Sequence, residues 1–306
     1  MSHIVKPRFV ARAFDGRQIF TDELSEVEFR ADVTAAAVLA RYVEAEETFR
    51  AVLDNYGELE VSRLSIAQED LLLGHVSHTR AMRHRLLLDR RYANFLSSCR
   101  LYLEFRRSNR VHEANPAGRE AVVRVSSAQY DTSLGYRVME ALRNYVQHRG
   151  FPLSGLVYQL SAMGEVGDRV SQTYIKPEID FDKLRESGSF KGTVLSEVEA
   201  LKSPGDLRLW TREYVDGLRR VHDVLIREVG GKVDPSVATY RAVCRRFADR
   251  IASDEVIVRY ELRDEFDRSV TSYAFTNEIV EHVIMIRLEN RYRGDVSGQF
   301  VTNVIE

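Results

Sequence analysis

The residues best suited to chemistry in this 306-residue chain lie close together, between Ala141 and Gly150. Arg143, Asn144 and His148 all fall near the end of a predicted helix. An arginine can hold a phosphate group, and a histidine can move a proton near neutral pH. Cleavage of RNA without a metal ion needs both tasks, because the 2′-hydroxyl must lose a proton while charge builds on the phosphate. The stretch therefore predicts metal-independent chemistry on RNA.

Spacing alone is weak evidence for such a site. With 38 arginines and 8 histidines, about three arginine–histidine pairs four to six residues apart are expected by chance. Four occur with the arginine first: Arg80–His84, Arg106–His112, Arg107–His112 and Arg143–His148. The last pair is predicted to lie in the last turns of one helix, where residues five apart are offset by about 140° and about 7.5 Å. Because arginine is long and His148 lies in the last turn, the two side chains are expected to converge on one phosphate.

The histidine and the arginine of this motif also have structural explanations. A histidine at the end of a helix often only interacts with the last carbonyls and the helix dipole. A helical arginine is often an ion-pair partner, here of Glu140 or Asp131. Because both residues are near an exposed helix end, replacement of either by alanine is expected to leave the fold intact.

The elements around the motif are predicted from hydrophobic period and from cap and turn residues. Helices are expected at about 24–57, 65–107 (with a break near Leu88–Asp89), 117–149, 206–229 and 236–253. Asn55–Gly57 is the expected stop of the first helix, Ser65 the N-cap of the second, and Gly150 the C-cap of the third. Hairpins are expected around Asp15–Gly16 and over about 153–177, and a strand at 256–260, whereas 275–291 fits a helix or a strand.

These elements predict a mainly α fold, a helical bundle with an inserted β-hairpin and a small α+β C-terminal extension. The bundle core spans 22–254, and the inserted hairpin occupies about 153–177. The extension spans 255–306 and packs with the N-terminal hairpin of residues 1–21.

Charge is segregated along the chain although the net charge is only −2. Residues 21–60 hold 11 acidic side chains and 3 arginines, whereas residues 80–110 hold 9 arginines, Asp89 and Glu104. The two segments fit oppositely charged helices that pair with one another, and the second also fits a surface for a phosphate backbone. The expected RNA-binding residues are Arg80, Arg83, Arg85, Arg90, Arg91 and Arg149.

The sequence also limits the possible cellular location and metal chemistry of the protein. Cys99 and Cys244 are the only cysteines, which fits a reducing compartment, and both are expected to be small buried residues. No signal-peptide core or membrane span is evident, so a cytoplasmic protein without membrane contact is expected. A histidine group at His75, His78 and His84 beside Glu69 and Asp70 could suit a metal, but its spacing matches no established metal motif. We expect no metal and no cofactor.

Arg143-Asn144-Tyr145-Val146-Gln147-His148 resembles the signature of HEPN domains, which is an arginine, a polar residue, three variable residues and a histidine. The resemblance covers about residues 24–150, and helices after 205 would complete the bundle. It implies a HEPN-like helical bundle that works as a homodimer in bacterial toxin–antitoxin or antiphage systems, with RNA and an antitoxin or defence partner as ligands. It also implies a catalytic set of Arg143 on the phosphate, His148 as acid or base, and Asn144 orienting either group.

Two functions remain open at this stage. The first is a HEPN-type endoribonuclease that acts through 2′-hydroxyl attack, which would make the chain an enzyme. The alternative is a non-catalytic HEPN-like module that binds nucleotide or RNA or scaffolds a partner. Geometry distinguishes them, because exposure of Arg143 and His148 in a cleft favours the first, and burial in ion pairs favours the second.

Overall fold

The computed structural model describes residues 6–13, 18–74, 77–108, 116–150, 153–163, 170–201, 205–251, 256–263, 269–275 and 278–289. Over these residues the chain is mainly helical with two small antiparallel sheets, which confirms the fold class at this coarse level. The chain divides into two compact units. We call Thr48–Leu225 the helical unit and Met1–Glu47 with Ile226–Arg291 the sheet unit. The division passes through helices α1 (Glu26–Leu73) and α8 (Leu207–Gly230).

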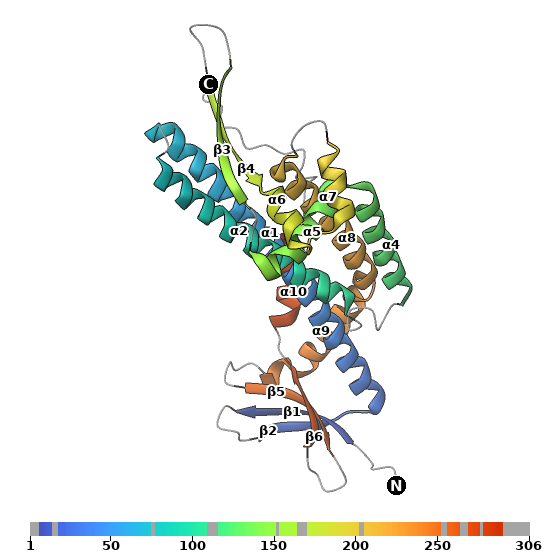
Figure 1. Cartoon of the computed structure of the whole chain (residues 1–306). Helices are drawn as coiled ribbons and strands as arrows, with labels where there is room; N and C mark the ends of the chain where they lie inside the picture. The colour runs from blue at the N-terminus through green and yellow to red at the C-terminus, as the bar shows by residue number, and fades with distance from the viewer. Residues whose placement is uncertain are drawn as a thin grey trace. The chain divides into compact units, whose positions relative to one another are not determined.

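The helical unit contains five long helices and two short ones among its described residues (Figure 1). They are α1 (Glu26–Leu73, from Thr48 onward), α2 (His78–Arg107), α4 (Pro116–Thr132), α5 (Leu134–Arg149), α6 (Phe181–Ser187), α7 (Gly192–Glu199) and α8 (Leu207–Gly230, up to Leu225). Helix α5 contacts α2, α4 and α7, so the motif helix is covered on several sides.

Aromatic side chains fill the core of the helical unit. Tyr214 on α8 lies edge-on to Tyr136 with ring centroids 4.9 Å apart, and also contacts Phe95. Phe49 stacks on His222 at 4.0 Å, and both are buried. On α8, Tyr214, Leu218, Val221 and Leu225 are buried, whereas Leu209 is exposed.

Helix boundaries differ from the sequence-based expectations where tertiary packing overrides local signals. Helix α1 continues through Gly57 to Leu73, because Val52, Tyr56 and Leu59 keep one buried stripe across the glycine. The helical region splits at Gly74, which has a φ of 64°, and not near Asp89. The N-cap of α2 is therefore Ser77, whose hydroxyl accepts from the Arg80 amide, and not Ser65.

The predicted third helix consists of two helices. Ser133 separates α4 from α5 and caps α5 by accepting from the amide of Tyr136 at 3.0 Å. Helix α5 ends at Gly150, as predicted, and the φ of 78° there favours glycine because it has no Cβ.

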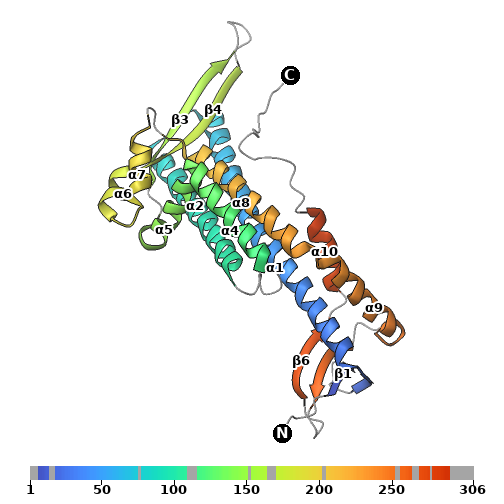
Figure 2. The same ribbon diagram turned by 90° about the vertical axis from the view of Figure 1, so that its right-hand side faces the viewer.

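A long hairpin follows α5, also as predicted. Strands β3 (Leu153–Met163) and β4 (Val170–Ile179) pair in antiparallel fashion. Both views show the hairpin beside the end of the helical unit where α1 joins α2 (Figures 1 and 2). Hydrogen bonds help to hold it there, one between Tyr158 and His84 and one from Thr173 to Asp70.

The sheet unit contains a four-stranded antiparallel sheet of order β2-β1-β5-β6. Its strands are β1 (Lys6–Ala13), β2 (Gln18–Glu23), β5 (Val256–Arg263) and β6 (Ser269–Phe275). The N-terminal hairpin thus shares a sheet with the C-terminal strands. Helices α9 (Val233–Ile251) and α10 (Glu278–Glu289) belong to the same unit, and α10 settles the ambiguity of residues 275–291 in favour of a helix.

Candidate functional site

The motif lies on α5, a helix that is buried over most of its described length. Val138, Met139, Leu142 and Tyr145 are buried at three-and-four spacing, as expected for a helix with a core-facing stripe. Asn144, between two of these positions, is exposed. The helix therefore separates the neighbouring motif residues Arg143 and Asn144 into different environments.

Arg143 is buried, with 8% of its surface exposed. Its Nη2 donates to Glu140 Oε2 at 2.9 Å, which selects Glu140 over Asp131 as the ion-pair partner. The other Glu140 oxygen accepts from the hydroxyl of Tyr214 on α8 at 2.5 Å. The expectation that Arg143 is accessible near the helix end is therefore wrong, because this turn of α5 is packed into the core.

The surroundings of this ion pair are strongly desolvated. Burial raises the pKa of the Cys99 thiol, and the charge of Glu140 raises it further whereas Arg143 lowers it. Burial also raises the pKa values of Tyr136 and Tyr214. Cys99 is fully buried, as predicted, whereas the side chain of Cys244 lies outside the described residues. In such surroundings an uncompensated guanidinium would be costly, so Glu140 and Arg143 stabilise each other.

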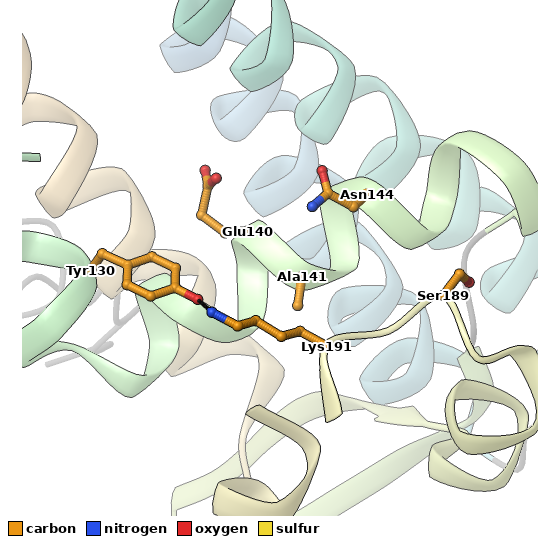
Figure 3. Close-up of a pocket in the computed structure, with 6 residues that line it drawn as sticks. All are labelled: Tyr130, Glu140, Ala141, Asn144, Ser189 and Lys191. Atoms are coloured by element: carbon orange, nitrogen blue, oxygen red, sulfur yellow. Dashed lines mark hydrogen bonds between the residues drawn. The ribbon is translucent and has the colours of Figure 1, made fainter. Parts of the chain in front are cut away.

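Asn144 lines a pocket at the surface of the helical unit (Figure 3). The pocket has a volume of about 310 Å³ and is lined by Tyr130, Glu140, Ala141, Asn144, Ser189 and Lys191. Lys191 lies at the N-cap position of α7, and its Nζ donates to the Tyr130 hydroxyl at 2.5 Å. The same ammonium lies 4.8 Å from the centre of the Tyr130 ring. The pocket thus combines a positioned cation with an exposed amide.

His148 lies in the last turn of α5, one turn beyond Asn144, and its side chain lies outside the described residues. The neighbouring Arg149 is exposed. Of the expected catalytic set, the structure therefore places Arg143 in the interior and Asn144 in a pocket.

The arginines expected to bind RNA fall into two groups. Arg80, Arg85 and Arg91 on α2 are ion-pair partners of Glu69, Asp89 and Glu58 respectively. Arg83, Arg90 and Arg149 are exposed. Both predictions for the basic segment 80–110 therefore remain possible. Arg80 and Arg91 pair with acidic residues of α1, as expected for oppositely charged helices, and other arginines face solvent, where they could contact a phosphate backbone.

The α2 arginines lie near the chain that leaves α5. Arg85 Nη1 donates to the carbonyl oxygen of Leu153 at 3.5 Å, and Leu153 begins strand β3. Arg83 and Arg90 are seven residues apart, which puts them on nearly the same face of α2, about 10 Å apart along its axis.

The histidine group considered for a metal has another role. His84 is buried, and its Nδ1 and Nε2 lie 2.8 Å from the Tyr158 hydroxyl and 3.2 Å from Glu69 Oε2. His78 is exposed at the start of α2, and His75 lies outside the described residues. Across the part of the chain that the structure describes, no group of three or more histidine, cysteine, aspartate or glutamate side chains could hold a metal ion.

Tyr130 and Lys191 are among the pocket residues that the sequence did not indicate. They are 61 positions apart, and nothing local in the sequence links a tyrosine of α4 to a lysine before α7. Their pairing depends on α5 packing against both helices, which is a tertiary contact.

No protein-family model matches the chain, and no curated protein and no solved structure matches it. Among the described helices, none is long and apolar enough to cross a membrane.

Proposed function

We propose that the helical unit is a HEPN-like module that binds RNA without cleaving it. The observation that carries this proposal is the distribution of guanidinium groups around the motif. Arg143 is buried and neutralised by Glu140, whereas Arg83, Arg90 and Arg149 are exposed. A guanidinium that binds phosphate must be accessible, so the exposed arginines suit the RNA backbone and Arg143 suits a structural role.

RNA contact through these arginines is electrostatic in this proposal. Phosphate contacts supply most of the sequence-independent affinity and make binding depend on salt. Arg85 links the two parts of the surface, because its hydrogen bond to Leu153 brings α2 beside the end of α5. The choice of RNA over DNA follows from the resemblance of the motif to HEPN domains.

A binding experiment tests this surface. We expect the protein to bind a single-stranded RNA in EDTA without shortening it. Arg83→Ala with Arg90→Ala should weaken binding roughly tenfold, and each lost phosphate contact should reduce the slope of log K against log salt by about 0.7. The matched control is Arg30→Ala with Arg50→Ala, which removes two exposed arginines from α1 and should change affinity less than twofold. Equal weakening by the two double variants would contradict the proposed surface.

A second candidate is a metal-independent endoribonuclease, favoured by one observation: Asn144 is exposed in a pocket one turn before His148. In this reading the 2′-hydroxyl attacks the phosphorus, and the bond to the 5′-oxygen breaks. His148 takes or gives the proton, and Arg143 holds the phosphate after leaving Glu140. The products are a 2′,3′-cyclic phosphate and a 5′-hydroxyl. A toxin or antiphage role, with an antitoxin or defence partner, belongs to this second candidate.

The same RNA incubation separates the two candidates. Cleavage in EDTA that produces 2′,3′-cyclic ends and is lost in His148→Ala would establish the nuclease and overturn the binding-only proposal. RNA that stays intact in the presence of the wild-type protein would support the binding-only proposal. The HEPN resemblance also implies a homodimer. Sedimentation at micromolar concentration tests the dimer, and a strict monomer would contradict it.

A further inference from the structure

The pocket beside Asn144 has the chemistry of an anion site, apart from any RNA-binding surface on α2. Four of its side chains carry hydrogen-bond donors: Ser189, whose hydroxyl donates to Ser187, and three others that come from different parts of the chain. Those three are Tyr130 on α4, Asn144 on α5 and Lys191 before α7. Figure 3 shows them around one space, with the Lys191 ammonium meeting the Tyr130 hydroxyl.

The Lys191 charge is positioned but not neutralised. Its ammonium has three donors, and the Tyr130 hydroxyl accepts one of them at 2.5 Å. Among the described residues no carboxylate lies within ion-pair distance of it. Because the Tyr130 oxygen accepts from Lys191, its own proton is free to point toward a ligand.

Glu140 does not make the pocket acidic, although it contributes to the lining. Both of its oxygens are occupied, one by Arg143 at 2.9 Å and the other by Tyr214 at 2.5 Å. The charges of Glu140 and Arg143 cancel, so the local balance of the pocket and its support is the single positive charge of Lys191. That balance favours an anionic ligand.

We propose that this pocket binds a phosphate monoester, the group found in a free nucleotide and at the 5′ end of an RNA. A monoester carries a charge of about −1.5 to −2 at pH 7 and three acceptor oxygens, which match the donors on Tyr130, Asn144 and Lys191. A volume of about 310 Å³ is at the lower end of the range for small-molecule sites and holds a phosphate together with its sugar. Lys191 binds the anion, and Asn144 and Tyr130 orient it. The inference does not require the proposed RNA surface, because a free monoester needs no contact with α2.

Calorimetric titration of the full chain with AMP and with adenosine tests this site. AMP should bind at least tenfold more tightly than adenosine, since a charged hydrogen bond contributes more than a neutral one. Lys191→Met should weaken AMP binding about tenfold or more. The control Lys183→Met removes an exposed lysine of α6 and should change AMP binding less than twofold. Asn144→Ala should weaken it less than Lys191→Met does, with Asn94→Ala as the exposed amide control on α2.

One RNA of fixed sequence, with and without a 5′-phosphate, shows which source of the monoester the pocket accepts. A preference for the phosphorylated end that disappears in Lys191→Met assigns the pocket to RNA ends, whereas AMP binding without that preference assigns it to free nucleotides. Equal affinity for AMP and adenosine, or unchanged AMP affinity in Lys191→Met, would overturn the proposal. Salt-dependent RNA binding through Arg83 and Arg90 could still hold in that case, so the two proposals fail separately.

Discussion

Arg143 and Glu140 form a buried ion pair one turn apart on α5, with Nη2 and Oε2 separated by 2.9 Å. The side chains are only 9% and 14% exposed, and Tyr214 adds a hydrogen bond to the carboxylate. Removal of one partner from such a pair leaves an uncompensated charge in a desolvated site. Arg143 is therefore expected to contribute mainly to the stability of the folded protein.

Arg143→Ala should lower the free energy of unfolding by roughly 3 kcal/mol, measured by urea denaturation. Arg143→Ala combined with Glu140→Ala should cost less than the sum of the single variants, because no unpaired charge remains. The control is Arg100→Ala. Arg100 pairs with Glu104 at 2.6 Å on the surface of α2, where loss of the pair should cost less than about 1 kcal/mol.

An Arg143→Ala variant as stable as Arg100→Ala, yet unable to cleave RNA that the wild type cleaves in EDTA, would contradict the structural role. That outcome would restore the catalytic assignment of Arg143.

The hairpin β3–β4 is held to the helices through His84, which bridges Tyr158 on β3 and Glu69 on α1. Tyr158→Phe should lower stability by about 1 kcal/mol and increase hydrogen exchange in the hairpin, because the phenyl ring keeps the packing but loses the hydroxyl. Tyr174→Phe is the matched control, since the Tyr174 hydroxyl donates to Gln159 within the hairpin. Equal exchange in the two variants would show that His84 does not dock the hairpin.

The sequence predicted those parts of the fold that depend on local signals. Gly150 ends α5 because the backbone there needs a positive φ, and the alternation after Pro152 correctly indicated β3 and β4. Gly57 was misread as a stop. Its neighbours Tyr56 and Leu59 are buried in the core, and this packing outweighs the weak helix propensity of one glycine.

Only the contact between residues close together in the sequence could be predicted for the site. Glu140 is three residues before Arg143, so helix geometry alone allows the pair. The burial of that pair depends on Tyr214, which is 74 positions from Glu140, and the pocket depends on Lys191 meeting Tyr130 across 61 positions. Such contacts follow from helix packing and leave no periodic trace in the sequence.

Two glycines of the helical unit differ in the space around them, so their substitution by alanine is expected to have opposite effects. A Cβ at Gly135 would lie 2.8 Å from the Trp210 Cα, a backbone atom that cannot yield easily. Gly135→Ala should therefore lower stability by roughly 1–3 kcal/mol. Gly57→Ala meets no atom within 4 Å and lies in the middle of α1, so it should raise stability by about 0.5–1 kcal/mol. Thermal denaturation checks both, and a stabilising Gly135→Ala would show that Gly135 and Trp210 are farther apart than described.

Asp89 on α2 gives the protein a distinctive dependence on pH. Burial raises the pKa of its carboxyl from 3.8 to about 6, although Arg85 at 3.1 Å and Lys183 oppose the shift. Because the folded pKa lies above the unfolded one, the folded state binds more protons between about pH 4 and pH 6. This contribution therefore favours the folded state at low pH and is lost as pH rises through 6.

Asp89→Asn removes the titrating group, so its stability relative to wild type should change with pH. A shift of about two units corresponds to at most roughly 3 kcal/mol, which already includes the attraction of Arg85, and partial exposure of the carboxyl reduces this figure. We expect the variant to be more stable than wild type by roughly 1–2 kcal/mol at pH 7 and to lose this advantage near pH 4, measured by urea denaturation at both values. Asp54→Asn is the control, because Asp54 is 60% exposed and pairs with Arg50 on the surface. A stability difference between Asp89→Asn and wild type that is the same at both pH values would show that the Asp89 carboxyl titrates normally in the folded protein.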